Sequence, residues 1–243
     1  DTLRSVSEII GLKENSNGKT GVVWVRTSGF NQHDEKVIQY VRWVMVRKRD
    51  NNSIKPETIV PSLKSHLDVE DLIIPNGLNF ENYNFELSGE NYCLNDYSVG
   101  EKINHVDGVT IEDAEHMMAT RIWQNTAKVH FDVTQRSDQS RLVYGGHIIS
   151  LARSLSFNGL ANAQLIAAIN SGSHVNPCKA GDTVTAWSEI LDISQTTSPS
   201  IGAIRLRLVA LKNGVDEFDL HDLNGLYKSN VLLDLDYWAF IPT

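Results

Sequence analysis

Apolar and polar residues alternate along six short segments of the chain. Residues 202–207 read Gly-Ala-Ile-Arg-Leu-Arg, in which aliphatic and charged side chains take turns, and residues 21–26 follow a similar pattern. A period of two is typical of a strand with one buried face. The other four segments are residues 1–10, 38–45, 182–191 and 233–240. The pattern therefore predicts two groups of three strands, one at each end of the chain.

The two groups of strands are copies of each other. Residues 1–10 match residues 182–191 at an offset of 181, with Asp, Thr, Ser and Glu in identical places. The same offset relates the second strands, and the third strands match after a connection that differs by 14 residues. Chance similarity between β-rich segments is the alternative, but identity, spacing and order agree. The repeat predicts a duplicated antiparallel meander.

Two helices are predicted before the second group of strands. Residues 109–122 carry a helical apolar stripe, with Thr110 as the expected N-cap and Asp113 where a capping box needs an acid. Residues 146–157 place apolar side chains at the i, i+3, i+4, i+7 spacing, and Gly159 stands where a helix commonly stops. We expect the second helix to be long and mostly apolar.

A long apolar helix with a curved antiparallel sheet around it is the hot-dog arrangement, and a short strand at residues 167–170 would add to that sheet. We predict an α+β chain of tandem hot-dog units. Residues 1–50 would be three strands of an incomplete first unit, residues 51–95 a linker, and residues 96–243 a complete second unit. Since the first copy has no counterpart of the helices, we expect the intact protein to have an N-terminal segment of roughly 90 further residues with its own long helix.

Composition excludes several classes of protein. The 243 residues are 41% hydrophobic, as in packed globular chains, and the formal net charge is −8, whereas nucleic-acid-binding proteins normally carry a basic face. No stretch approaches the roughly 18 apolar residues of a membrane span, and the first residues do not form a secretion signal. Cys93 and Cys178 are too few for a disulfide framework. We therefore expect a cytoplasmic protein without nucleic-acid or membrane partners.

Several segments together resemble a known family of acyl-CoA enzymes. Residues 96–103 read like the strand that opens MaoC-like dehydratase domains, and residues 121–132, 141–152 and 181–184 follow in the expected order. The similarity extends over the whole chain, including residues 40–50. Within the MaoC-like family, the sequence is most similar to the mesaconyl-CoA hydratases, also called β-methylmalyl-CoA dehydratases, which have two hot-dog units in one chain.

The resemblance implies a catalytic pair, which this chain carries in altered form. The MaoC-like motif places an Asp five residues before a His, and here the His is His130 but the Asp position holds Asn125. An amide cannot accept a proton at neutral pH. We therefore assign His130 as the main proton carrier, although a lone His in a loop is more often structural, and Asn125 as a group that orients water or substrate. Asp132 and Asp96 are the nearest candidates for a carboxylate partner.

Gly145 and Gly146 lie at the expected start of the long helix. Residues without side chains let a ligand approach closely, and the N–H groups of a first helical turn have no partner within the helix. We predict that they bind the thioester oxygen as it gains negative charge; the alternative is a tight turn without a ligand. His147 follows in the same turn, where it is either a neutral group near the substrate or part of the packing.

The resemblance implies the reversible hydration of an enoyl-CoA thioester, most directly mesaconyl-CoA to β-methylmalyl-CoA, with an acyl-CoA as partner and further homo-oligomerisation open. No cofactor is expected, because the thioester already acidifies the α-position. His105, His116 and His174 share no metal-ligand spacing with a Cys or carboxylate cluster, so we expect no metal site. The alternatives are an acyl-CoA thioesterase, which uses the same fold, and a CoA-binding or structural unit without activity.

Overall fold

The computed structural model describes residues 1–50, 52–214 and 218–243, and the chain divides into two compact units, Asp1–Lys64 and Ser65–Thr243. The expected linker is shared between them, since its residues up to Lys64 belong to the first unit and those from Ser65 to the second. No helix among the described residues is long and apolar enough to cross a membrane.

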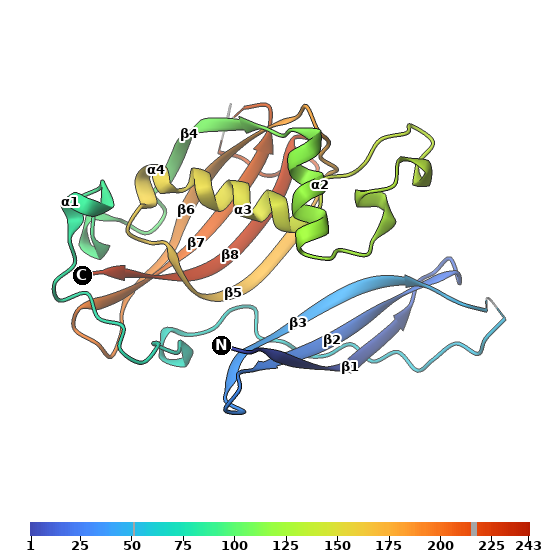
Figure 1. The fold of residues 1–243 in the computed structure, drawn as a ribbon, viewed down its shortest axis with the longest axis horizontal. Coiled ribbons are helices and arrows are strands. Elements are labelled where there is room, and N and C mark those ends of the chain that lie inside the picture. Colours follow the sequence, from blue (N-terminus) through green and yellow to red (C-terminus); the bar gives the residue numbers. More distant parts are fainter. Residues whose placement is uncertain (51, 215–217) are drawn as a thin grey trace. The chain divides into compact units, whose positions relative to one another are not determined.

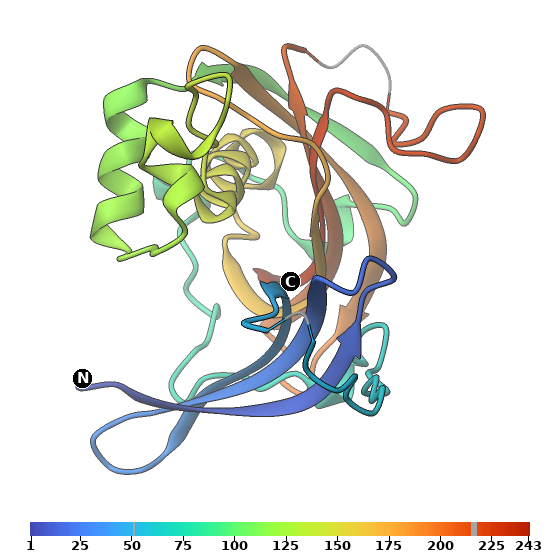
Figure 2. The same cartoon turned by 90° about the vertical axis from the view of Figure 1, so that its right-hand side faces the viewer.

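The second unit has the hot-dog fold, as predicted. Its five antiparallel strands have the order β4-β6-β7-β8-β5, and the sheet curves around the helix α3 (Figures 1 and 2). The bounds are β4 Lys102–Thr110, β5 Leu165–His174, β6 Thr183–Gln195, β7 Ile201–Lys212, β8 Val231–Pro242 and α3 Gly145–Leu155. The strand expected at residues 167–170 is confirmed as part of the longer β5.

Apolar side chains fill the space between α3 and the concave face of this sheet. Ile148, Ala152 and Leu155 of α3 are all buried in one core cluster with Leu206 of β7 and Leu235 of β8. Burial of a large aliphatic side chain contributes roughly 1.5–3 kcal/mol. The hydrophobic effect therefore holds α3 against the strands, and this fixes where the N-terminal turn of the helix lies.

The outer face of the sheet is covered as well. Residues Val69, Leu72 and Phe80 pack against Trp238 and Phe240. Part of the expected linker is thus packed structure of the second unit.

The short helices are η1 Val69–Asp71, α1 Phe85–Ser88, η2 Leu94–Asp96, η3 Lys128–His130, η4 Val133–Gln135 and α4 Phe157–Leu160.

The first helix begins later than predicted. It is α2, Asp113–Ile122, with Glu112 as the N-cap and Glu115 completing its capping box, so the assignment of Thr110 as N-cap was wrong. The reason is that Thr110 ends β4 and pairs with Thr183 of β6. Strand pairing outside the segment overrides the local helical signal.

The long helix ends earlier than expected. It stops at Leu155, with Ser156 as its C-cap, and the kinked turn α4 follows. Gly159 lies inside this turn with a φ of 91°, a left-handed conformation that glycine adopts at low cost. Gly159, which was predicted to end the long helix, therefore lies in the kinked turn that follows it.

The first unit is a three-stranded sheet with the order β1-β2-β3, drawn in blue in Figure 1. Its strands are β1 Arg4–Glu14, β2 Thr20–Phe30 and β3 Lys36–Arg47. The remaining described part of this unit pairs with β1 at a single bridge between Leu12 and Ile59. The helices and outer strands of the second unit have no counterpart among the described residues of the first.

The pairing in the first unit repeats that of the second residue for residue. Ile9 pairs with Val25, and Ile190 pairs with Leu206, each 181 positions later. A β-bulge directly follows Ile9 in β1, and another directly follows Ile190 in β6. The β2–β3 and β7–β8 pairs also share one register, at offsets of 181 and 195. The internal repeat predicted from the sequence is therefore confirmed.

Candidate active site

His130 lies on η3, in the loop between α2 and α3, and it is held in one orientation. Its Nδ1 atom lies 3.0 Å from the carbonyl oxygen of Leu142. A carbonyl only accepts hydrogen bonds, so the partner assigns the proton of the neutral ring to Nδ1. Nε2 is then left with a lone pair. His130 also contacts the ring of Tyr144 edge to face, with centroids 6.2 Å apart. In this tautomer Nε2 is the ring nitrogen that can accept a proton.

Asn125 lies on the same loop, and its carbonyl oxygen Oδ1 accepts a 2.9 Å hydrogen bond from the backbone N–H of Ala127. The residue before it, Gln124, has a φ of 51°, which is uncommon for a non-glycine residue. No hydrogen bond joins Asn125 to His130 in the part of the chain that the structure describes. The amide nitrogen of Asn125 has no hydrogen-bond partner among the described residues, so it can donate to a ligand.

Neither candidate carboxylate partner forms a hydrogen bond or an ion pair with His130 within the described residues. Asp132 accepts hydrogen bonds from the hydroxyl and the N–H of Thr134, and these bonds lower the pKa of its carboxyl group. Asp96 accepts a 2.7 Å bond from the N–H of Cys93, which lowers its pKa as well. Both side chains cap short helical turns. The described structure therefore pairs neither carboxylate with the imidazole.

Gly145 and Gly146 form the first turn of α3, and rings from other positions lie directly against both. A Cβ atom on Gly145 would collide with the imidazole of His174, and one on Gly146 would collide with the hydroxyl of Tyr144. The N–H groups of Gly145 and Gly146 have no partner inside the helix, whereas that of His147 donates a 2.9 Å hydrogen bond to the carbonyl oxygen of Tyr144. Backbone donors and three aromatic side chains thus meet at one end of α3.

His147 faces α2. Its Nε2 atom lies 2.9 Å from Oε1 of Glu115, without the alignment of a hydrogen bond, and its side chain is only 10% exposed. The buried His116 lies near it on α2, and burial lowers the pKa of this imidazole. Asp113, at the start of α2, pairs with both His116 and Arg141. This cluster joins α2 to the start of α3.

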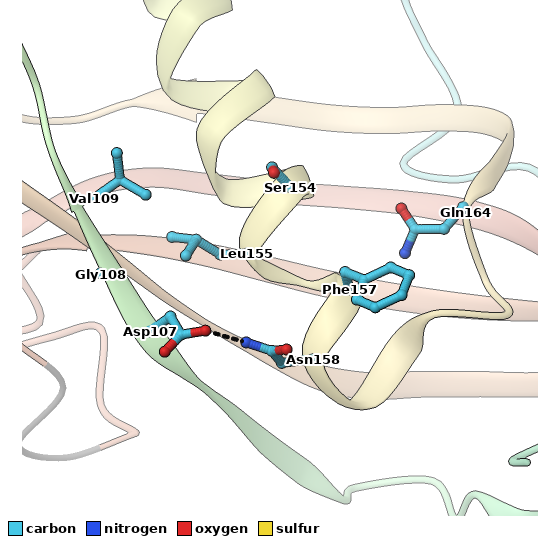
Figure 3. Close-up of a pocket in the computed structure, with 8 residues that line it drawn as sticks. All are labelled: Asp107, Gly108, Val109, Ser154, Leu155, Phe157, Asn158 and Gln164. Carbon is cyan, nitrogen blue, oxygen red and sulfur yellow. Dashed lines mark hydrogen bonds between the residues drawn. The ribbon is translucent and has the colours of Figure 1, made fainter. Parts of the chain in front are cut away.

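A separate open cavity of about 670 Å³ lies near the other end of α3 (Figure 3). It is lined by Asp107, Gly108, Val109, Ser154, Leu155, Phe157, Asn158 and Gln164. The amide nitrogen of Asn158 donates a 2.8 Å hydrogen bond to Asp107 across it. The lining contains no imidazole and none of the predicted site residues, so hydration chemistry is not expected here.

Close to this cavity, His105 is completely buried. Its Nδ1 atom lies 2.7 Å from the carbonyl oxygen of Asn158, and its Nε2 atom lies 2.8 Å from the hydroxyl of Ser188. Burial lowers the pKa of His105 to about 4. The neutral ring accepts from Ser188 and donates to Asn158, which fixes the turn after α3 to the sheet. Among the described residues no group of three or more His, Cys, Asp or Glu could hold a metal ion.

Sequence reasoning did not single out Tyr144 or His174 as site residues. The signal for His174 is the register of the sheet, because His174 pairs with Leu233, whose side chain is buried in the core under α3. Paired residues share a face, which places His174 beneath the helix. That pairing joins residues far apart in the chain, and no local pattern shows it.

No family model matches the sequence, but the chain is similar over its whole length to two curated proteins. The chain is 62% identical over 242 residues to mesaconyl-CoA hydratase of Cereibacter sphaeroides, covering 100% of this chain and 71% of that protein. It is 56% identical over 247 residues to β-methylmalyl-CoA dehydratase of Chloroflexus aurantiacus, covering 100% of this chain and 70% of that protein.

Two solved structures extend the comparison. A MaoC domain protein dehydratase from Chloroflexus aurantiacus superimposes with a TM-score of 0.94 at 55% identity, covering 99% of this chain and 70% of that one. A Mycobacterium tuberculosis protein with a double hot-dog fold has a TM-score of 0.65 at 21% identity, covering 99% of this chain and 69% of that one. The second similarity concerns the fold alone.

Proposed function

The chain belongs to the mesaconyl-CoA hydratase family of MaoC-like dehydratases, and we propose that it catalyses the reversible hydration of mesaconyl-CoA to β-methylmalyl-CoA. The observation that carries this proposal is the 62% identity to a mesaconyl-CoA hydratase over the whole chain. The arrangement of His130 beside the first turn of α3 supports it, because hydration needs a base close to a group that stabilises an enolate.

In the proposed reaction His130 carries the proton. Its Nε2 atom takes a proton from water while the water oxygen bonds to the β-carbon of the enoyl thioester. The electrons of the C=C bond move to the thioester oxygen, which gives an enolate. The α-carbon then takes the proton back from His130, so that H and OH have been added across the double bond. The hydrogen bond from Nδ1 to Leu142 supports this role, since it leaves Nε2 as the basic nitrogen.

The other predicted residues assist the same steps. We assign the placement of the attacking water to the amide nitrogen of Asn125, and the binding of the enolate oxygen to the N–H groups of Gly145 and Gly146. His147 is a positioning residue in this scheme, because its side chain faces Glu115 on α2. The thioester itself acidifies the α-carbon, so the scheme uses no metal ion or redox cofactor.

A single assay tests the proposal. Purified protein is incubated with mesaconyl-CoA while the enoyl-thioester absorbance and the free thiol are followed together. Hydration predicts loss of the absorbance without release of thiol. Release of thiol at the same rate would instead identify a thioesterase, and no change in either signal would indicate a binding or structural unit.

A further inference from the structure

His174 is the last residue of β5, and it points at the proposed site from the sheet. Its partner in β8, Leu233, is buried in the core under α3. The three ring atoms Nε2, Cε1 and Cδ2 of His174 line the space where a side chain of residue 145 would lie, and Nε2 comes nearest. Gly145 thus makes room for an imidazole that a different element supplies.

We propose that His174 is a further substrate-contacting residue, whose ring N–H donates a hydrogen bond to the thioester oxygen beside the N–H groups of Gly145 and Gly146. The inference rests on the proposed hydration of an acyl-CoA and deepens it. His174 stabilises the enolate in this scheme, whereas His130 moves the proton.

The imidazole of His174 is able to act as a hydrogen-bond donor. Within the described part of the chain His174 makes no hydrogen bond or ion pair, so both ring nitrogens are available to a ligand. Burial lowers the pKa of the imidazole, even though the residue as a whole keeps an exposed surface through which a substrate can reach it. A neutral imidazole polarises a carbonyl by donating its N–H without giving up the proton.

The loop between α2 and α3, which contains Asn125 and His130, explains why a further hydrogen-bond donor is needed. Asn125 stands where the related motif has an Asp and cannot transfer a proton. His130 is then the single proton carrier, and the reaction depends more strongly on stabilisation of the enolate oxygen. The imidazole of His174, supplied by β5, lies directly against Gly145, whose N–H group belongs to the proposed oxyanion site.

The first experiment replaces His174 by Phe, which keeps a ring of similar size and removes both nitrogens. We expect kcat for mesaconyl-CoA hydration to fall by roughly 10²–10³, as when one oxyanion donor is lost, with KM within about threefold of the parent. His174→Gln restores an N–H donor and should recover part of the activity. The matched control is His221→Phe, because His221 stacks on Tyr227, which packs against a core cluster that contains no residue of α3. A kcat for His174→Phe within about threefold of the parent would overturn the inference.

A second measurement separates chemistry from packing. Gly145→Ala should lower Tm, because its Cβ collides with the His174 ring, and adding His174→Ala should restore Tm by removing that ring. We expect kcat of the double variant to stay as low as that of His174→Ala. Recovery of parental kcat in the double variant would show that His174 only fills space. Turnover of mesaconyl-CoA by the parent tests the proposed function, and the ratio of variant kcat to parent kcat tests the role of His174. Failure of the proposed function can therefore be told apart from failure of the inference about His174.

Discussion

At the residue scale, Asn125 is one position where the resemblance to the MaoC-like motif implies an Asp. Asn125→Asp restores a carboxylate five residues before His130, and we expect kcat within about tenfold of the parent or above it, because a second proton carrier becomes available. Steady-state rates with mesaconyl-CoA measure kcat. Asn125→Ala is the control, because it provides neither an amide nor a carboxylate. Complete inactivation of Asn125→Asp would show that the amide itself is required.

Buried His105 predicts a loss of stability in acid. The unfolded chain protonates this side chain below a pKa of about 6.5, whereas the folded chain does so only near 4. Between these two pKa values the unfolded state binds more protons than the folded state. The stabilisation that neutral His105 gives to the folded state is therefore complete above about pH 6.5 and is lost as the pH falls towards 4. The free energy of unfolding should decrease by roughly 3 kcal/mol over this range. The lowered pKa values of His116 and His174 act in the same direction.

Denaturant unfolding at several pH values between 7 and 4 tests this prediction. His105→Gln should show a weaker loss of stability on acidification than the parent, and His33→Gln, at an exposed position of the first unit, should follow the parent. An unchanged pH dependence in His105→Gln would remove His105 as the cause.

Site residues differ in how far the sequence alone reveals them. His130 and Asn125 could be proposed because the motif that contains them is contiguous. Tyr144 and His174 could not, since their positions depend on packing around α3 and on the pairing of β5 with β8. The roles of His130, Asn125, Gly145, Gly146 and His147 stay predictions.

At the element scale, the turn η2 docks on the sheet through one buried side chain. Leu94 is 1% exposed, and a Cβ on Gly202 of β7 would collide with its side chain. We expect Leu94→Ala to lower the free energy of unfolding by roughly 2–5 kcal/mol, and Gly202→Ala by roughly 1–3 kcal/mol through overpacking. Denaturant unfolding measures both changes.

Leu87 provides the matched control for this pair, because it lies in the same segment and is 85% exposed. Leu87→Ala should change stability by less than about 0.5 kcal/mol. If Leu94→Ala were as neutral as Leu87→Ala, residues 65–95 would behave as a linker and not as part of the second unit.

The strands could be predicted where the internal repeat contains the same pattern twice. Both meanders were found from the offset of 181, and the shared bulges after Ile9 and Ile190 follow it. The start of α2 was not predictable, because Thr110 satisfies its backbone through β6. The packing of residues 69–80 on Trp238 and Phe240 also depends on distant contacts.

At the scale of the whole molecule, the first unit presents the same strand face that α3 covers in the second. Its helix-side positions include apolar residues that are 43% to 67% exposed, namely Leu3, Ile9, Ile38, Tyr40 and Val46. Apolar surfaces of this kind are normally covered, and we propose that a helix equivalent to α3 covers this one in the intact protein. The chain spans about 70% of the length of the curated relatives it matches.

The dye ANS, which binds exposed apolar surface, tests this proposal on the 243-residue chain. We expect ANS fluorescence to rise in its presence and to fall in an Ile9→Lys/Ile38→Lys variant, because both side chains belong to the uncovered face. The control is Ile73→Lys, which changes an apolar residue of the second unit that is 84% exposed and should leave the signal unchanged. Equal fluorescence in all three proteins would contradict the proposal.

In the proposed reaction, the site at the start of α3 hydrates an enoyl-CoA with His130 as the proton carrier. The most direct test is the kcat of His130→Ala with mesaconyl-CoA, measured beside a circular dichroism spectrum that establishes folding. We predict an unchanged spectrum and a loss of roughly 10²–10⁴ in kcat, the usual effect of removing a general acid–base group. A folded His130→Ala variant that keeps kcat within about threefold of the parent would show that His130 is not the proton carrier.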